Sequence, residues 1–214
     1  VFHTKKILSH NPSFYKDSII EGIRQFLKIK KNKRICSNLI SEVRIGTTVA
    51  TNTLLTKTGD KTCLFITKGF KDSLKIGDQS RLDIFARRII PHKTLYDNVY
   101  EISERLSNTG KVLVKIDAKN ATILMKKALN KGYKSAAIVL IHAWKHPKHE
   151  KILKKIAIEL GFRNVCISYD TAPLIGLNSR GDTTVVDAYL TPKLNRYTKN
   201  ISLNIKNTKI FYIK

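Results

Sequence analysis

A nearly continuous apolar run constrains the fold of this chain most. Residues 136–141 read Ala-Ala-Ile-Val-Leu-Ile, and a strand of this kind is typical of a parallel sheet that is buried on both faces. A second β-prone run covers residues 62–67, and helical patterns lie at 117–131 and 147–160, each followed by a glycine. This order predicts an α/β fold, with a mostly parallel sheet and flanking helices on both faces.

The remaining patterns predict further elements, although their boundaries are less sharp. Residues 99–106 and 112–116 are expected to pair as a hairpin around the turn at Asn108-Thr109-Gly110. Residues 77–91 show no clear periodicity and are expected to be irregular. We expect strands at 1–8, 43–45, 165–168 and 201–214, and helices at 15–29, 50–57, 69–76 and from 179 onward.

Charge is the most unusual feature of the composition. The 214 residues include 40 Lys and Arg against 16 Asp and Glu, which gives a net charge of +24 and raises nucleic acid or an anionic membrane as partners. The basic residues are spread along the chain, and no zinc-finger or RNP-like motif accompanies them. We therefore interpret the charge as a compositional background, and nucleic acid is not expected as a partner.

Cysteine content and hydropathy point to a soluble, cytosolic protein. Cys36, Cys63 and Cys166 are odd in number and far apart, which suggests neither a disulfide framework nor a zinc cluster. No apolar run approaches the roughly 18 residues of a membrane span, and no signal peptide is visible. A reducing compartment fits these features.

A glycine followed by hydroxyl and amide side chains forms the first candidate site. Gly46 permits a turn after the strand at 43–45, and Thr47, Thr48, Thr51 and Asn52 then offer neutral hydrogen-bond groups where a helix begins. Such groups can hold an anionic oxygen. An ordinary helix N-cap is the alternative, because Thr and Asn favour helix starts.

Three histidines form a second cluster. The spacing of His142, His146 and His149 suggests a metal site. However, Pro147 interrupts the helix between them, and no cysteine or carboxylate completes a set of four ligands. We predict structural capping roles for these histidines and no metal.

Several motifs, taken together, resemble the N-terminal domain of the hydantoinase A and 5-oxoprolinase family. They occur in order as Gly-Thr-Thr-Val-Ala-Thr-Asn at 46–52, Thr-Lys-Gly-Phe-Lys-Asp at 67–72 and Ile-Gly-Asp-Gln-Ser-Arg-Leu-Asp-Ile-Phe at 76–85. The stretch 141–150 is similar to the family's strand-His and Pro-x-His-Glu pattern. Residues 179–183, 187–192 and 196–197 resemble the ATP-dependent 5-oxoprolinase branch.

The resemblance implies a ribonuclease-H-like or actin-like ATPase lobe. It further implies opening of 5-oxo-L-proline to L-glutamate with cleavage of ATP to ADP and phosphate, magnesium and potassium as cofactors, and a cytosolic role in glutathione metabolism through the gamma-glutamyl cycle. An N-methylhydantoinase-type amidohydrolase is the alternative within the family, and the resemblance allows a homodimer. We expect a hydantoinase/oxoprolinase N-terminal domain at 1–172 and the start of the following domain at 173–214.

The resemblance also predicts which parts of the ATP site this chain lacks. The family's Asp-x-Gly-Gly-Thr type phosphate hairpin is expected upstream of Val1, and its later glycine-rich segment beyond Lys214. The chain alone is therefore expected to be an incomplete fragment without ATPase or lactamase turnover.

Within this framework we rank the candidate contacts to substrate or nucleotide, while the catalytic residues stay unassigned. Arg81 is expected either to bind the substrate carboxylate or to form a surface ion pair with Asp83 or Asp78. Arg180 and Asp187 are expected to position substrate or metal, or to support an interdomain structure. The full set is Gly46, Thr47, Thr48, Asn52, Arg81, Asp83, Arg180 and Asp187.

A basic nucleic-acid-binding α/β domain remains the competing hypothesis. A ribonuclease H site needs clustered carboxylates around two metals, and the 16 acidic residues show no such cluster in the sequence. Affinity that falls steeply with salt would favour this alternative. A decayed gene product without activity is a third hypothesis.

Overall fold

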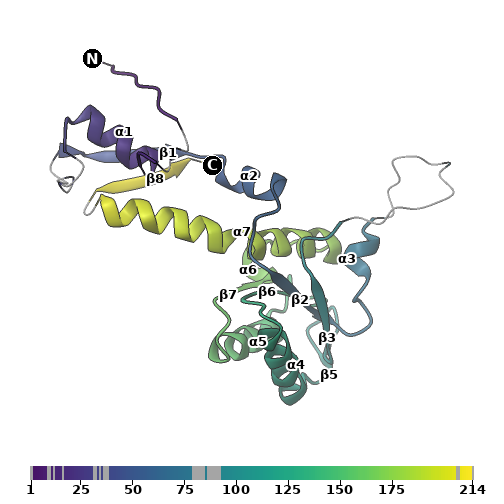
Figure 1. Cartoon of the computed structure of the whole chain (residues 1–214). Helices are drawn as coiled ribbons and strands as arrows, with labels where there is room; N and C mark the ends of the chain where they lie inside the picture. The colour runs from purple at the N-terminus through teal and green to yellow at the C-terminus, as the bar shows by residue number, and fades with distance from the viewer. Residues whose placement is uncertain are drawn as a thin grey trace. The chain divides into compact units, whose positions relative to one another are not determined.

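The computed structural model describes residues 2–8, 11, 13–15, 17–30, 33, 35, 39–78, 85, 93–205 and 208–213. The chain divides into two compact units (Figure 1). The larger unit consists of residues 53–192, and the smaller unit of residues 1–52 together with 193–214. Each unit has its own sheet and its own hydrophobic core. The domain boundary expected between residues 172 and 173 stays a prediction.

A four-stranded parallel sheet forms the centre of the larger unit. Its strand order is β3-β2-β6-β7, and Leu64 of β2 lies beside Ala137 of β6. Every residue of β2 and β6 is buried, and burial on both faces was predicted for the apolar run that forms most of β6. The strands are β2 (Thr62–Thr67), β3 (Asn98–Ile102), β6 (Ser135–Val139) and β7 (Asn164–Ile167).

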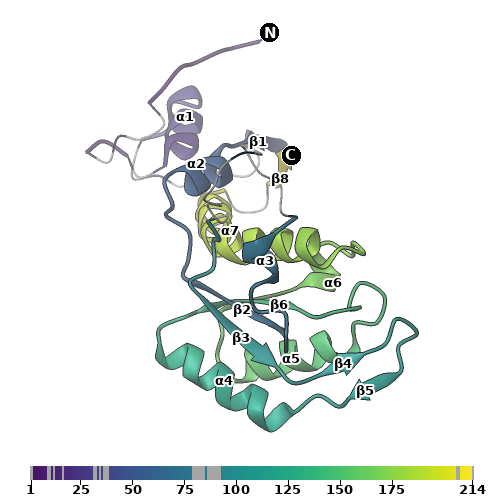
Figure 2. The same ribbon diagram turned by 90° about the vertical axis from the view of Figure 1, so that its right-hand side faces the viewer.

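Helices cover both faces of this sheet, so the predicted α/β arrangement is confirmed (Figure 2). One face packs against α4 (Ala118–Asn130) and α5 (Lys148–Glu159), through residues such as Phe65, Ile138, Met125 and Leu153. The other face packs against α3 (Ser73–Ile76) and the first part of α7 (Leu177–Asn204), through residues such as Leu64, Val139, Leu74 and Val185.

The ends of α4 follow the sequence signals closely. The carboxylate of Asp117 accepts a hydrogen bond from the backbone N–H of Asn120 at 2.9 Å, which satisfies one of the free donors at a helix start. Beyond the helix, Gly132 adopts φ 86°, a conformation that favours glycine and ends the helix.

The predicted hairpin at residues 99–116 is partly wrong. Its first segment divides into β3, which pairs with β2 in the main sheet, and β4 (Arg105–Leu106), which alone pairs with β5 (Val112–Val114). Tyr100 and Ile102 are buried in the same core cluster as Phe65 of β2. Burial against the large sheet therefore outweighs the local turn signal.

The smaller unit is built around two parallel strands, β1 (Glu42–Gly46) and β8 (Lys209–Ile213). Its first helix, α1 (Ser18–Phe26), is capped by Asp17, whose carboxylate accepts from the N–H groups of the second and third helical residues. A shorter helix, α2 (Val49–Leu55), follows β1. The buried core of the unit consists of Ile20, Ile35, Ile45, Ile201 and Ile205.

Two strands expected in this unit are absent or shorter. Residues 2–8 form no strand, and Phe2 and Leu8 are exposed. The strand expected from residue 201 begins only at Lys209, because α7 continues to Asn204. Ile201 and Ile205 are four residues apart, a spacing that places both on one helical face in the core.

A proline lies inside α7. Pro192 has no N–H, so the carbonyl of Ala188 receives no hydrogen bond from it. That carbonyl instead accepts from the hydroxyl of Ser135 at 2.5 Å and from the side-chain amide of Asn164 at 3.1 Å. The first residues of β6 and β7 thus replace the missing helical bond.

Candidate functional site

The carboxyl ends of β2 and β6 lie beside each other in the sheet of the larger unit. The chain leaves β2 toward α3 on one face and leaves β6 toward α5 on the other. In open α/β sheets, ligands bind outside the carboxyl ends of strands where neighbouring connections diverge in this way. This edge is therefore the candidate functional region of the larger unit.

A buried carboxylate ties this edge together. Glu104 is 3% exposed, and its Oε1 accepts a hydrogen bond from the hydroxyl of Thr67, the last residue of β2, at 2.5 Å. The same hydroxyl oxygen accepts from the backbone N–H of Ile141 at 3.0 Å. Nδ1 of His149, in the first turn of α5, lies 2.7 Å from Glu104 Oε2. The Glu104 carboxylate thus connects the end of β2 with the start of α5, and the Thr67 hydroxyl extends this link to the residues after β6.

Arg180, a candidate from the sequence, forms a second buried cross-link. Its side chain comes from the first turn of α7 and has no exposed surface. Nε donates to the hydroxyl of Ser168 at 2.8 Å. The terminal nitrogens donate to the carbonyl oxygens of Leu174 at 2.7 Å, Ile175 at 3.3 Å and Leu140 at 2.6 Å. All these contacts lie within the larger unit, so the guanidinium fixes the loops around the start of α7.

Glu150 completes this network. Its carboxylate accepts hydrogen bonds from the Ser168 hydroxyl at 2.6 Å and from the backbone N–H groups of Leu140 at 2.9 Å and Tyr169 at 3.0 Å. Burial raises the pKa of Glu150 to about 7, against the opposing effect of these hydrogen bonds and of the Arg180 charge. A carboxyl group with a pKa near neutrality is thus enclosed beside the ends of β6 and β7.

His142 lies at the same edge in an unusual backbone conformation. Its φ of 59° is in the left-handed region, and its carbonyl accepts from the N–H groups of Lys145 at 3.2 Å and His146 at 3.0 Å. Burial lowers the pKa of His142, and the charges of Arg105 and Arg180 lower it further. A half-buried imidazole that favours its neutral form is therefore presented at the edge.

The three histidines have separate contacts. His149 pairs with Glu104, as described above, and Nε2 of His146 lies 3.1 Å from the carbonyl oxygen of Asn108. Across the described residues, no group of three or more His, Cys, Asp or Glu side chains is arranged to hold a metal ion. Both contacts lie within the larger unit, and the structural capping roles expected for the three histidines stay predictions.

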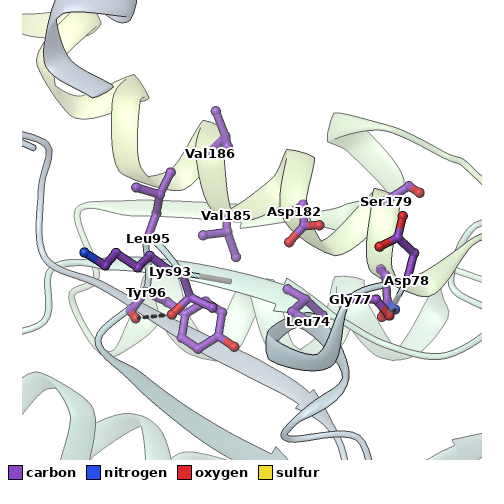
Figure 3. A pocket seen from close by; sticks show the side chains of 12 residues that line it. Leu74, Gly77, Asp78, Lys93, Leu95, Tyr96, Ser179, Asp182, Val185 and Val186 are labelled. Carbon is purple, nitrogen blue, oxygen red and sulfur yellow. Dashed lines mark hydrogen bonds between the residues drawn. The ribbon is translucent and has the colours of Figure 1, made fainter. Parts of the chain in front are cut away.

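A pocket of about 350 Å³ lies between α3, residues 93–96 and the start of α7 (Figure 3). Its polar lining includes the carboxylates of Asp78 and Asp182 and the hydroxyl of Ser179. Asn178 joins the two helices there, because its side chain accepts from the Ser73 hydroxyl at 2.5 Å and donates to the Gly77 carbonyl at 2.8 Å. Leu74, Lys93, Thr94, Leu95, Tyr96, Val185 and Val186 complete the lining.

This pocket brings together two motifs that are about a hundred residues apart in the sequence. One contributes Gly77 and Asp78, and the other contributes Ser179 and Asp182. Gly181, in the second motif, permits a close approach, because a Cβ there would lie 2.9 Å from the Leu74 side chain. The small residue thus lets α7 pack tightly against α3 at the base of the pocket.

Asp187 is partnered within the larger unit. Its carboxylate accepts from the hydroxyl of Thr191 at 2.7 Å and from that of Thr171 at 3.4 Å. Burial, together with the nearby Asp187 carboxylate, raises the pKa of the Cys166 thiol to about 12. Burial likewise raises the pKa of Cys63 to about 12, so both thiols favour the protonated form at neutral pH.

The threonine-rich bend lies in the smaller unit and its side chains are exposed. The Thr47 hydroxyl oxygen accepts from the Val49 N–H at 3.2 Å, and the Asn52 amide donates to the Thr48 hydroxyl at 3.4 Å. None of Gly46, Thr47, Thr48 and Asn52 is buried among apolar side chains. These contacts fit a helix start, and the exposed groups are also open to a ligand, so both interpretations stand.

Arg81 and Asp83 lie outside the described residues, and their roles stay predictions. Of their motif, the described part includes Gly77 and Asp78 at the pocket. The binding roles of the other candidates, including Arg180 and Asp187, also stay predictions.

Sequence reasoning missed several members of the buried networks. Thr67 and Glu150 belong to motifs that carried the family resemblance, but neither was considered as a site residue. Glu104 and Ser168 gave no signal beyond being polar residues next to β-prone runs. A polar residue directly after a buried strand was the available clue, because such positions lie at the carboxyl edge of a parallel sheet.

Comparison with known proteins places the chain in a family. The family described as the hydantoinase/oxoprolinase N-terminal region matches residues 1–161. The chain belongs to this hydantoinase/oxoprolinase family. Among its relatives, 5-oxoprolinase 1 of Arabidopsis thaliana is 39% identical over 91% of the chain, and 5-oxoprolinase of Saccharomyces cerevisiae is 35% identical over 98%. The match covers only 17% and 19% of these relatives, so the chain spans less than a fifth of their length.

Solved structures of ATP-dependent enzymes share the fold of this hydantoinase/oxoprolinase chain. The ATP-dependent caprolactamase from Pseudomonas jessenii superposes with a TM-score of 0.74 at 27% identity, covering 95% of the chain and 31% of that structure. A nucleotide-free acetone carboxylase superposes with a TM-score of 0.62 at 16% identity, covering 79% of the chain and 27% of that structure. At this identity the likeness supports the fold alone. The predicted fold class, an α/β ATPase-type lobe with mainly parallel strands, is confirmed.

Among the described residues, no helix combines the length and the apolar character needed to cross a bilayer.

Proposed function

We propose that this chain is part of an ATP-dependent cyclic amide hydrolase of the 5-oxoprolinase type, which converts 5-oxo-L-proline to L-glutamate and cleaves ATP to ADP and phosphate. The observation that carries this proposal is the pocket of Figure 3, where Gly77 and Asp78 meet Ser179 and Asp182. Both segments belong to the motifs that carry the resemblance to the family, and two relatives of the chain are named 5-oxoprolinases.

The proposed coupling to ATP has a chemical reason. An unstrained amide is stabilised by resonance and is a poor electrophile. Transfer of a phosphoryl group to the amide oxygen turns that oxygen into a leaving group, so that water can attack the carbonyl carbon and break the ring C–N bond. Phosphoryl transfer itself depends mainly on positioning and on neutralisation of charge.

The lining of the pocket suits a small polar ligand. Its volume of about 350 Å³ falls within the range of small-molecule sites. Asn178 and Ser179 supply neutral hydrogen-bond groups for a lactam, and Lys93 supplies a positive charge for a carboxylate. Magnesium is bound in proteins through one or two carboxylates together with substrate phosphates, and Asp78 and Asp182 are of that type. When bound, the ion would neutralise phosphate charge.

The buried side chain of Arg180 supports one wall of the pocket. The contacts of Arg180 fix the loop before α7 and the carbonyl of Leu140. Because Ser179 and Asp182 flank Arg180 on the same helix, the cross-link holds the side of the pocket that they form. We propose Arg180 as a positioning residue in this sense. Potassium, the homodimer, the cytosolic location and the binding roles of Gly46, Thr47, Thr48, Asn52, Arg81, Asp83 and Asp187 remain parts of the proposal that rest on the family resemblance.

The test is a substitution in the full-length protein that contains this chain. Asp182→Asn is expected to lower kcat/KM for release of glutamate from 5-oxo-L-proline by at least about 100-fold, because it removes a pocket charge. Asp170→Asn is the matched control, since Asp170 pairs with Lys154 on the surface of the same unit. Equal activity of the Asp182 and Asp170 variants, or turnover of caprolactam in preference to 5-oxo-L-proline, would contradict the proposal.

The 214-residue chain alone gives a second test. We expect no glutamate release and no 5-oxo-L-proline-dependent ATP cleavage from it, because it spans less than a fifth of the 5-oxoprolinase relatives. Measurable turnover by the purified chain would refute this expectation.

A further inference from the structure

His142 combines a strained backbone with an imidazole that the fold does not use. Its φ of 59° lies in the left-handed region, which costs free energy for a residue with a Cβ and little for glycine. The side chain is half-buried, yet within the described part of the chain neither ring nitrogen forms a hydrogen bond, in contrast to the rings of His146 and His149. A turn that only redirected the chain would therefore be better served by glycine at this position.

Hydrogen bonds fix both residues directly before His142. The N–H of Leu140 donates to a carboxylate oxygen of Glu150 at 2.9 Å, and the carbonyl of Leu140 accepts from Arg180 at 2.6 Å. The next N–H, that of residue 141, donates to the hydroxyl of the last residue of β2 at 3.0 Å. All three partner side chains are buried. The surrounding structure thus over-determines the strained conformation, which is the condition under which strain persists at functional sites.

The groups around the His142 ring favour its neutral form. Burial lowers the pKa of His142, and the charges of Arg105, Arg180 and His146 lower it further, against the opposing effect of Glu104. These groups come from β4, from α7, from the turn after β6 and from the segment between β3 and β4. Because the pKa lies below its ordinary value of 6.5, the ring is neutral at pH 7 and has a lone pair that can accept a proton.

The position of His142 connects the edge of the sheet with the pocket of Figure 3. Leu140, two residues before His142, contacts Arg180. Ser179 and Asp182, which flank Arg180 in α7, line the pocket. One hydrogen bond therefore separates the strand end that carries His142 from the helix that forms the pocket wall. This is also the edge at which the connections of β2 and β6 diverge, where ligands bind in open α/β sheets.

We propose that His142 is the general base of the ring-opening reaction, an inference that rests on the proposed function. Its neutral imidazole takes a proton from water while the water oxygen bonds to the carbonyl carbon of the phosphorylated lactam. The imidazolium then gives that proton to the lactam nitrogen as the C–N bond breaks, and the electron pair of this bond stays on the nitrogen. The hydroxyl on the carbon loses its proton to solvent and becomes the carbonyl of an acyl phosphate, which a second water hydrolyses to glutamate and phosphate.

The experiment compares turnover and stability in the same variants. In the full-length protein that contains this chain, His142→Gly is expected to lower kcat for glutamate release from 5-oxo-L-proline by at least about 100-fold. In the 214-residue chain, the same change is expected to keep or raise the melting temperature, because glycine adopts this backbone conformation without strain. Imidazole added to the assay can occupy the space of the missing ring and is expected to raise the rate of this variant at least about tenfold.

The pH profile adds a readout that a purely structural role would not change. A base must be neutral to accept a proton, so kcat of the parent protein is expected to fall below pH 6.5, the ordinary pKa of histidine. His142→Asn is the second variant, because asparagine tolerates the left-handed conformation but cannot act as this base. We expect it to lose activity as the glycine variant does and to lack the fall below pH 6.5.

Lys57 provides the matched control. It is exposed just after α2 and also has a left-handed backbone, with φ 53°. Lys57→Gly relieves the same kind of strain and is expected to change kcat by less than about twofold. Equal losses of kcat in the two glycine variants would overturn the proposal, as would a His142→Gly rate within about threefold of the parent or a loss that imidazole does not restore. In each of these cases turnover by the parent would still support the proposed function, whereas a parent without turnover would contradict that function itself.

Discussion

The two units differ in whether their polar candidate side chains are buried or exposed. The larger unit packs helices on both faces of a four-stranded sheet, and within it Arg180, Glu150 and Glu104 are almost completely buried. The smaller unit has two strands and a small isoleucine-rich core, and its candidate residues Thr47 and Thr48 are exposed. Only a core thick enough to exclude water can hold charged groups in fixed, mutually satisfied positions.

This difference bears on function. In the larger unit, buried hydrogen bonds set the position of the pocket walls before any ligand arrives, which lowers the entropic cost of binding. In the smaller unit, the exposed side chains of Thr47 and Thr48 make local contacts at the start of α2. The first arrangement favours selectivity for shape, and the second lets the side chains adjust to what they contact.

The largest expected effects test whether the two cores are separate. Phe65→Ala removes a fully buried ring from the larger core and is expected to lower the free energy of unfolding by about 3–5 kcal/mol. Ile201→Ala, in the smaller core, is expected to cost about 2–5 kcal/mol. By hydrogen exchange, the Ile201 variant should lose protection in α1 and β1 and keep it in β2 and β6. Equal loss of protection in both units would show that they share one cooperative core.

The next effect tests the buried cross-link. Arg180→Met keeps the approximate length of the side chain but leaves three carbonyl oxygens and the Ser168–Glu150 pair without their donor. We expect a loss of about 3–5 kcal/mol in urea unfolding, as for other broken buried pairs. Arg163→Met, at an exposed position just before β7, is the control and should change stability by about 0.5 kcal/mol or less. Similar losses of unfolding free energy in the two variants would show that burial does not determine how much an arginine contributes to stability here.

The smallest effect is a pH dependence. The pKa of Glu150 rises from 4.5 to about 7 on folding, so the folded state binds a proton more tightly than the unfolded state. The stability that this proton contributes is complete below pH 4.5 and is lost as the pH rises through 7, by on the order of 1–3 kcal/mol. Glu150→Gln should therefore flatten the profile of unfolding free energy between pH 4.5 and 7.5. A variant that retains the slope of the parent would assign that slope to other groups.

The sequence predicted the larger unit well because its signals are local and agree with one another. The apolar strands at 62–67 and 136–141 and the Asp117 cap have the expected structure, since burial and capping are specified by adjacent residues. The family motifs could also be identified from the sequence, and residues from two of them line one pocket.

The polar networks and the smaller unit were harder to predict. Glu104 and His149 are 45 residues apart, and Arg180 contacts the carbonyl of Leu140, 40 residues away. Local sequence patterns therefore cannot predict these contacts. The pairing of β1 with β8 joins segments from opposite ends of the chain. The strand expected at 201–214 was partly wrong because isoleucines at helical spacing pack as a continuation of α7.

Pro192 depends on side chains from two strands. Because Pro192 has no N–H, the Ala188 carbonyl would otherwise be unpaired. The Ser135 hydroxyl and the Asn164 amide, at the amino ends of two strands, donate hydrogen bonds to it instead. An alanine at 192 would reinstate the helical donor and set it in competition with both side chains for one oxygen. Either donor alone keeps that oxygen paired, so loss of one of the two side chains is expected to be tolerated beside the proline, whereas loss of both is not.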